Sequence, residues 1–473
     1  MTPLPAPSAY RADPAILELG DDFYDPVEAA DFPQTILRFR NDRWAPAVGL
    51  DGLTDEQWLR HFGRFAPLSG NLGRPLALRY HGHQFRVYNP DIGDGRGFLF
   101  AQLRDGAKED GGRLLDLGTK GSGRTPWSRF GDGRLTLKGG VREVLATEML
   151  EALGVETSKT FSLVETGEAL ERGDEPSPTR SAVLVRLQHS HIRIGTFQRL
   201  AYFQDGENLA KLTQYCLRHY YSDEGGGDDA PARLLAHVAR EAARLAASYI
   251  AAGFVHGVLN SDNIAITAQS FDYGPWRFTP YWDGRFTAAY FDHAGLYAFG
   301  RQPEAIHWDV LQLAASLHTI AEADALNASL DAFPPEFQSR LVEAIFARLG
   351  IRPTGEESDP ALLVAIETAL AEKEVTLDRF FFDWRGGRRR GPSPAENVYE
   401  SDAFAEFRHS IAQYEAQAEA LDHPYWSDEA PCSMHIDEVE AIWSRIDQSD
   451  DWSAFDQKVA AIRRMGEAMR AGA

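Results

Sequence analysis

The sequence predicts an α+β fold in two lobes, the first mainly β and the second mainly α. Strand-like runs dominate residues 76–200, and amphipathic helical patterns dominate residues 201–400. A glycine-rich turn, Gly93-Asp94-Gly95-Arg96-Gly97, precedes the strand-like run of the first lobe. We expect residues 1–75 to form an N-terminal extension packed on the lobes. Residues 401–473 are expected to form a helical C-terminal extension.

A lysine and a glutamate follow this turn in the order that protein kinases use. Lys120 ends a strand-like run, and Glu143, 23 positions later, lies on a predicted helix from Gly140 to Leu153. A flexible turn would cover phosphates, the lysine would reach them, and the glutamate would hold the lysine. Glu143 lies off the apolar stripe of its helix, so an exposed helix position is the alternative. The order of parts predicts a protein-kinase-like fold with a nucleotide site.

The charge of the chain bears on its partners. A formal net charge of −22 argues against nucleic acid, because an acidic surface repels a polyanion. ATP is also a polyanion, so its site must be locally basic. Between Arg96 and Arg142 there are ten Lys/Arg against five Asp/Glu. This reversal of sign marks where an anionic ligand would bind, with a solvated basic face as the alternative.

Two further segments suit phosphate groups. Gly131-Asp132-Gly133-Arg134 is a second glycine-rich loop, whose backbone N–H groups can line an anion site. Arg186 and Arg193 follow a buried-strand pattern at residues 181–187, and their forked guanidinium groups match phosphate oxygens. Salt bridges at the lobe junction are the alternative role for both arginines.

The segment from His256 to Asn263 carries the chemistry. Kinase-fold phosphotransferases have H-G-D-L-x-x-x-N here, followed by a metal-binding Asp. Aligned on His256, Asn263 and Asp272 fall on the metal-binding positions, whereas the catalytic base position is Val258. A valine cannot accept a proton, and Asp262 introduces a carboxylate beside Asn263 instead. This shift predicts different chemistry on ATP, although loss of the base alone would indicate a non-catalytic ATP-binding scaffold.

These motifs together resemble the SelO (selenoprotein O, or YdiU) family of pseudokinase-like protein adenylyltransferases. The matching pieces span roughly residues 80–310, and they are His81–Phe85, Gly93–Gly97, Lys120–Pro126, Gly131–Arg134, Ser190–Arg193, His256–Asn263 and Asp272–Pro275. The resemblance implies transfer of AMP from ATP to Ser, Thr or Tyr hydroxyls of proteins, with ATP flipped relative to protein kinases. A kinase-like phosphotransferase that moves the γ-phosphate is the alternative.

The resemblance also implies roles for individual residues. Asp262 would be the proton acceptor, and Asn263 and Asp272 would hold Mg²⁺ or Mn²⁺. Lys120 would contact phosphate and pair with Glu143. The remaining nucleotide contacts would come from Gly93, Gly95, Arg96, Asp132, Gly133, Arg186, Arg193 and Asp272.

The C-terminal part departs from the family pattern. Residues from about 400 onward match it poorly, and no cysteine follows Cys432, which puts thiol-based regulation in doubt. From Ala314 onward the chain is mostly amphipathic helix, and the basic run Arg385–Arg390 is expected to form an exposed loop.

Nothing in the sequence indicates a membrane or secreted protein. No run approaches the roughly 18 apolar residues of a membrane helix, and the start, Met1–Pro7, lacks the features of a signal peptide. Two cysteines, Cys216 and Cys432, form neither a disulfide framework nor a metal-ligand spacing. We expect a cytoplasmic protein without a membrane partner, and the sequence leaves the oligomeric state open.

Overall fold

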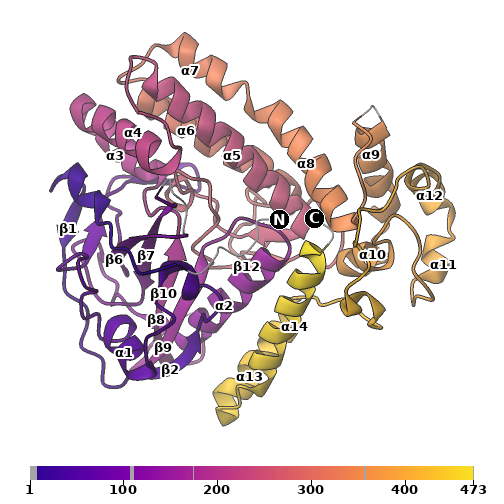
Figure 1. Ribbon diagram of the computed structural model, residues 1–473, viewed down its shortest axis with the longest axis horizontal. Coiled ribbons are helices and arrows are strands. Elements are labelled where there is room, and N and C mark those ends of the chain that lie inside the picture. Colours follow the sequence, from indigo (N-terminus) through magenta and orange to yellow (C-terminus); the bar gives the residue numbers. More distant parts are fainter. Residues whose placement is uncertain (1–7, 107–110, 174, 356–357, 472–473) are drawn as a thin grey trace.

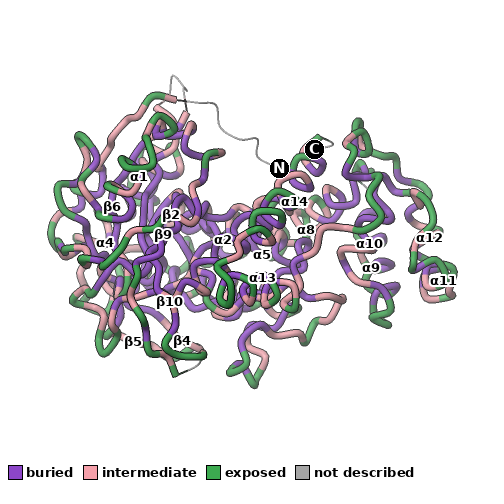
Figure 2. Tube along the Cα trace, turned by 90° about the horizontal axis from the view of Figure 1, so that it is seen from below, coloured by how far each residue is buried: buried purple, intermediate pink, exposed green. Residues whose placement is uncertain are grey.

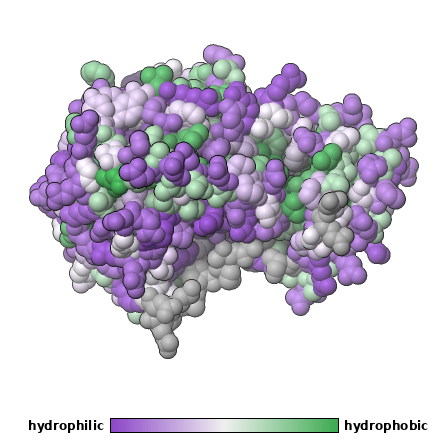
Figure 3. Space-filling view, turned by 90° about the horizontal axis from the view of Figure 1, so that it is seen from above, coloured by the Kyte–Doolittle hydropathy of each residue, from purple (hydrophilic) through white to green (hydrophobic). Residues whose placement is uncertain are grey.

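The fold is α+β, as predicted (Figure 1). The structure, a computed structural model, describes residues 8–106, 111–173, 175–355 and 358–471. Residues 1–7, where no signal peptide was expected, and residues 107–110 lie outside the described residues. Within the described ranges, no helix has the length and apolar character needed to cross a bilayer. The face drawn in Figure 3 is mainly hydrophilic, with apolar residues in small separate patches.

One eight-stranded sheet occupies the first part of the chain. Its order is β1-β3-β6-β7-β10-β9-β2, with β8 paired to β10, and every pair of neighbours is antiparallel. Two strands of the sheet come from the N-terminal segment. The strands are β1 (Tyr24–Pro26), β2 (Ile36–Arg40), β3 (Leu76–Leu78), β6 (Leu99–Arg104), β7 (Leu114–Lys120), β8 (Leu135–Thr136), β9 (Lys159–Leu170) and β10 (Thr179–Gln188).

Both faces of this sheet are buried, which explains the continuous apolar runs of β7 and β10. Alternate residues of a strand point to opposite faces. Leu184 of β10 therefore joins the core cluster that includes α2, while Val183 and Val185 join a second cluster with Trp58 of α1 (Asp55–Phe62). The N-terminal segment thus covers one face of the sheet and helix α2 covers the other.

Helix α2 (Leu137–Ala152) begins three residues earlier than predicted. The Thr136 hydroxyl accepts a hydrogen bond from the Gly139 amide, which satisfies an otherwise free N–H group at the helix start. The helix ends before Gly154, which has a φ of +85°. Gly140 lies so close to β9 that an added Cβ would be 2.4 Å from a Leu163 methyl carbon. Close packing of this kind fixes the helix against the sheet.

Helices make up most of the chain after β10. The short strands β11 (Phe254–His256) and β12 (Trp276–Phe278) form a separate antiparallel pair, as do β4 (Gly82–Gln84) and β5 (Val87–Asn89). The helices are α3 (Ile194–Tyr202), α4 (Gly206–Tyr220), α5 (Ala230–Ala252), α6 (Gln302–Leu317), α7 (Ala323–Leu330), α8 (Phe333–Leu349), α9 (Ser358–Leu370), α10 (Leu377–Asp383), α11 (Glu396–Tyr399), α12 (Ala405–Ile411), α13 (Ile436–Ser449) and α14 (Ser453–Arg470).

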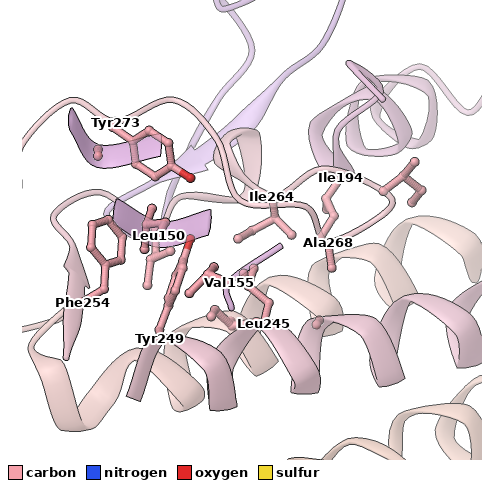
Figure 4. Close-up of a cluster of buried hydrophobic side chains, with 14 of the residues drawn as sticks. Leu150, Val155, Ile194, Leu245, Tyr249, Phe254, Ile264, Ala268 and Tyr273 are labelled. Carbon is pink, nitrogen blue, oxygen red and sulfur yellow. The ribbon is translucent and has the colours of Figure 1, made fainter. Parts of the chain in front are cut away.

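A shared core joins the sheet to these helices. Helix α5 runs through the buried interior (Figure 2). In Figure 4, Leu150 of α2, Tyr249 of α5 and Ile264 belong to one cluster of buried side chains. Ile264 directly follows the predicted metal ligand Asn263, so the loop that carries the predicted chemistry is anchored in this core.

The C-terminal helices pack on α2. Glu148 of α2 forms an ion pair with Arg463 of α14 at 2.7 Å, and Lys138 pairs with Glu440 of α13 at 2.7 Å. Gly466 of α14 has no side chain, which lets the helix approach Ala152 closely. The C-terminal segment therefore holds the helix that carries Glu143.

The basic run Arg385–Arg390 is not an exposed loop, so this prediction is wrong. Arg385 is 0% exposed, and its guanidinium donates to the Ala347 carbonyl at 2.6 Å and the Arg348 carbonyl at 3.1 Å, at the end of α8. Arg390 is half-buried and stacks on Phe382 at 4.1 Å. Helix C-terminal carbonyls and aromatic rings stabilise these cations, which is why a run of arginines lies against the protein interior.

Candidate functional site

Most of the predicted site residues line one cavity of about 700 Å³. Its wall contains seven Lys/Arg against five Asp/Glu, so the cavity is locally basic in a chain of net charge −22, as the sequence predicted. The predicted residues on this wall are Gly93, Gly95, Arg96, Lys120, Asp132, Gly133, Arg186, Arg193, Asp262 and Asp272. Glu143 and Asn263 are not among the lining residues, although each contacts or adjoins one: Glu143 pairs with Lys120, and Asn263 follows Asp262.

The glycine-rich turn precedes β6 and is covered by the loop of residues 124–131. A Cβ on Gly93 would be 2.6 Å from the Trp127 ring, and one on Gly97 would be 2.1 Å from the Thr119 carbonyl oxygen. The Thr125 hydroxyl donates to the Asp94 carbonyl at 2.5 Å. Glycine is therefore required here by close approach of neighbouring segments. The two loops form one unit above the cavity.

Lys120 connects the sheet, helix α2 and the segment before β12. It is 4% exposed at the end of β7, and its ammonium group forms an ion pair with Glu143 of α2, which is 1% exposed. The same ammonium lies 2.6 Å from Asp272 Oδ1. Two carboxylates thus hold the lysine at the cavity wall, where it can meet an anion.

Asp272 is the most strongly ionised acid of the site. Burial by itself would raise its pKa, but Lys120 and Arg186 outweigh burial and hold the pKa of Asp272 well below the usual range. Its backbone has a φ of +62°, which is uncommon for a residue other than glycine. Such conformations persist where the surroundings impose them, and they concentrate at functional sites.

Arg186 and Arg193 flank Phe271, the residue before Asp272. Their guanidinium carbons lie 5.1 and 4.9 Å from the Phe271 ring centre, and both side chains are buried. Arg193 also donates to Asp94 Oδ1 at 3.1 Å and to the Asp262 carbonyl at 2.9 Å. The structure brings the two predicted arginines to the same wall of the cavity.

Asp262 lies at the wall of this cavity and is 8% exposed. It belongs to the short 3-10 helix Ser261–Asn263, which packs against β4. Its Oδ1 atom is buried and makes no hydrogen bond within the described residues. Burial raises the pKa of Asp262 to about 6, although Arg193 lowers it in part. A carboxylate in this condition can accept a proton near neutral pH.

Asn263 and Asp272 fit a divalent cation in part. The Asn263 amide nitrogen donates to the Val258 carbonyl at 3.0 Å, and its Oδ1 accepts no hydrogen bond from the described residues. Asp272 Oδ2 likewise accepts no hydrogen bond from the described residues, and the ion pairs with Lys120 and Arg186 are through Oδ1. The described residues contain no group of three or more acids, histidines or cysteines that could hold a metal alone. Two protein oxygen donors, completed by phosphate oxygens and water, match the coordination preference of Mg²⁺.

Asp132 and Gly133 form the second glycine-rich loop of the cavity. Arg172, from the β9–β10 connection, donates to Asp132 Oδ2 at 2.8 Å, and the Arg134 amide donates to Oδ1 at 2.9 Å. Gly133 has a φ of +72°, and a Cβ there would be 2.2 Å from the Gly123 carbonyl oxygen. Only glycine suits this turn.

Sequence reasoning missed three residues of the site. Asp94 anchors Arg193, Trp127 packs on Gly93 and donates to Asp25 Oδ2 at 2.9 Å, and Arg129 lines the cavity. Asp94 lies inside the identified glycine-rich turn, so its carboxylate was the available signal, whereas Arg129 lies between the identified motifs and was marked only by the basic stretch from Arg96 to Arg142. The partners of Trp127 lie too far away in sequence to be predicted.

The arrangement is a locally basic cavity that can accept an anionic ligand, and comparison with known proteins shows the family of the chain. A family model described as "Protein adenylyltransferase SelO" matches residues 8–463. The protein nucleotidyltransferase YdiU of Gloeobacter violaceus is 44% identical over 469 residues, covering 96% of this chain and 95% of that protein. The protein of the same name from Synechocystis sp. is 41% identical over 473 residues, covering 95% of this chain and 97% of its own length.

The chain belongs to the SelO family and is a nucleotidyltransferase. The resemblance noted in the sequence is therefore confirmed. The expectation that residues from about 400 onward match the family poorly is wrong, because the family match extends to residue 463. The packing of α13 and α14 on α2 gives a structural reason for that match.

Proposed function

We propose that this protein is an AMP transferase that moves AMP from ATP to Ser, Thr or Tyr hydroxyls of other proteins. The observation that carries the proposal is the position of Asp262, which lines the same basic cavity as Lys120 and Asp272. At the position of the usual kinase base, Val258 offers no proton acceptor. Asp262 is the only acidic residue in the segment 256–263, so it is the only carboxylate there that could replace the usual base.

The reaction follows from this geometry. The Asp262 carboxylate takes the proton of the acceptor hydroxyl while its oxygen attacks the α-phosphorus of ATP. The bond between the α-phosphorus and the bridging oxygen breaks, and pyrophosphate leaves. Lys120, Arg186 and Arg193 stabilise the charge on the leaving group. ATP is then flipped relative to protein kinases, so that its α-phosphate faces Asp262.

Asn263 and Asp272 are the residues that would hold Mg²⁺ or Mn²⁺, and the bound cation would neutralise phosphate charge. Asp272 is already ionised, so it needs no proton release to bind a cation. Gly93, Gly95 and Arg96 on one loop and Asp132 and Gly133 on the other enclose the nucleotide.

We also propose that residues 76–200 and 201–400 are the two lobes of a kinase-like fold, flanked by extensions at 1–75 and 401–473. The Lys120–Glu143 pair and the placement of Asp272 on the cavity wall support this proposal. The protein would act on cytoplasmic proteins, with ATP as its co-substrate.

The test uses ATP labelled either at the α- or at the γ-phosphate, with mixed cell proteins as acceptors. We expect label from the α-position on protein, and pyrophosphate as the product. Label from the γ-position would refute the proposal in favour of phosphate transfer. Asp262→Asn should lower turnover about 10²–10⁴-fold while nucleotide binding persists. Metal-dependent ATP binding without any labelled product would identify a non-catalytic scaffold.

A further inference from the structure

Two cations of the cavity have no side-chain partner among the described residues. Seven Lys/Arg line the cavity, and five of them contact a carboxylate within 4 Å. These five are Lys120, Arg134, Arg172, Arg186 and Arg193. The guanidinium groups of Arg96 and Arg129 form no hydrogen bond or ion pair with the described residues, so both are available to a ligand.

The two available arginines belong to different segments of the cavity wall. Arg96 is part of the glycine-rich turn and is already proposed to enclose the nucleotide. Arg129 lines the same cavity as Asp262, and its loop covers the turn that Arg193 joins to the Asp262 carbonyl. Arg129 is therefore a cavity cation with neither a side-chain partner among the described residues nor an assigned ligand contact.

The loop that carries Arg129 is fixed at its base and open at its tip. Besides the Thr125 bond to Asp94, the Ser128 hydroxyl donates to the Gly95 carbonyl. Arg129 and the next residue, Phe130, are exposed, and Arg129 has a φ of +51°. The anchored loop therefore places Arg129 at the cavity wall, and its guanidinium makes no bond to the described residues.

We propose that Arg129 contacts the α-phosphoryl oxygens of ATP as the acceptor hydroxyl attacks. This inference rests on the proposed AMP transfer. A base must lie within hydrogen-bond reach of the hydroxyl, and that hydroxyl oxygen must lie about 3 Å from the phosphorus. An unpaired cation in the same cavity as the base is consequently available to the phosphoryl group that reacts there. As the new oxygen–phosphorus bond forms and the α–β bridge breaks, Arg129 stabilises the charge on the equatorial oxygens, as arginine fingers do in other phosphoryl transfers.

The experiment compares Arg129→Gln with a matched control, Arg124→Gln. Arg124 belongs to the same loop, is exposed, and donates to the Gly131 carbonyl without lining the cavity. We expect Arg129→Gln to lower the rate of AMP transfer about 10²–10³-fold, because the contact forms in the transition state. The dissociation constant for ATP should change by less than about threefold, and Arg124→Gln should resemble the wild type.

A chemical rescue separates contact from a structural role. In Arg129→Ala, the removed side chain leaves space for guanidinium ion, so added guanidinium chloride below its denaturing range should restore part of the activity. Neither the wild type nor Arg124→Gln should be activated by it. Turnover of Arg129→Gln equal to that of Arg124→Gln would overturn the inference. A loss of ATP affinity that accounts for the whole loss of rate would overturn it as well.

The same assay distinguishes failure of the inference from failure of the proposed function. If the wild type transfers no AMP, the proposed function fails before Arg129 is tested. If the wild type transfers AMP and Arg129→Gln does so equally fast, only the role of Arg129 is refuted.

Discussion

Lowering the pH from 7 to 5 should reduce kcat/KM for AMP transfer about tenfold. The pKa of Asp262 is raised to about 6 by burial, and the reaction needs its ionised form. With that pKa the carboxyl group is about nine-tenths ionised at pH 7 and about one-tenth ionised at pH 5. Activity is therefore present above the pKa and is lost as the pH falls through it. An unburied aspartate would stay largely ionised over this range, so its profile would be nearly flat.

The assay is α-labelled AMP transfer at low ATP concentration, because kcat/KM reports groups of the free enzyme. ATP also gains a proton in this range, so nucleotide binding is measured at each pH with Asp262→Asn, which has no carboxyl group to titrate. Circular dichroism at pH 5 checks that the fold persists. A midpoint near pH 4, or a profile with the same shape in Asp262→Asn, would refute the role of this carboxyl group.

Three other substitutions test the site and its support. Glu143→Gln should lower kcat/KM about 10–100-fold, because the cavity lysine loses one of two carboxylates; unchanged kinetics would contradict the pairing. Gly133→Ala should lower the free energy of unfolding, measured in urea, by about 1–3 kcal/mol, because alanine is strained at a positive φ. The control Gly173→Ala should leave the free energy of unfolding unchanged, because an added Cβ there meets open space. Arg385→Met should lower the free energy of unfolding by about 2–4 kcal/mol, because it leaves buried carbonyl groups without their donor. Equal stability of Arg385→Met and Arg388→Met would support the exposed-loop prediction instead.

The secondary-structure elements that carry the site were predictable because each has a local signal in the sequence. A continuous apolar run rich in β-branched residues marked β10, and the apolar stripe marked α2. The Lys120–Glu143 pair followed from the order of strand and helix, although Glu143 lies off the stripe of its own helix. Its burial comes from the ion pair with the lysine, since a lone carboxylate would not tolerate 1% exposure.

What the sequence did not reveal depends on partners far away in the chain. Arg172 holds Asp132 across 40 positions, and Trp127 reaches Asp25 across 102 positions. The burial of Arg385 reverses the usual meaning of a basic run, because the carbonyls at the end of α8 and the Trp426 ring take the place of water. Composition alone favours exposure for such a run, and only the tertiary structure supplies these acceptors.

Arg193 explains how the separate motifs act as one site. Its two terminal nitrogens reach Asp94 in the glycine-rich turn and the backbone of Asp262 in the predicted catalytic loop. Because the guanidinium is planar and rigid, it fixes the distance between these two segments more tightly than a lysine would. The nucleotide loop and the predicted base therefore cannot move apart without breaking a buried ion pair. The proposed base, placed four residues away from the usual kinase position, needs such a link, since the phosphate that it would serve is held by the other segment.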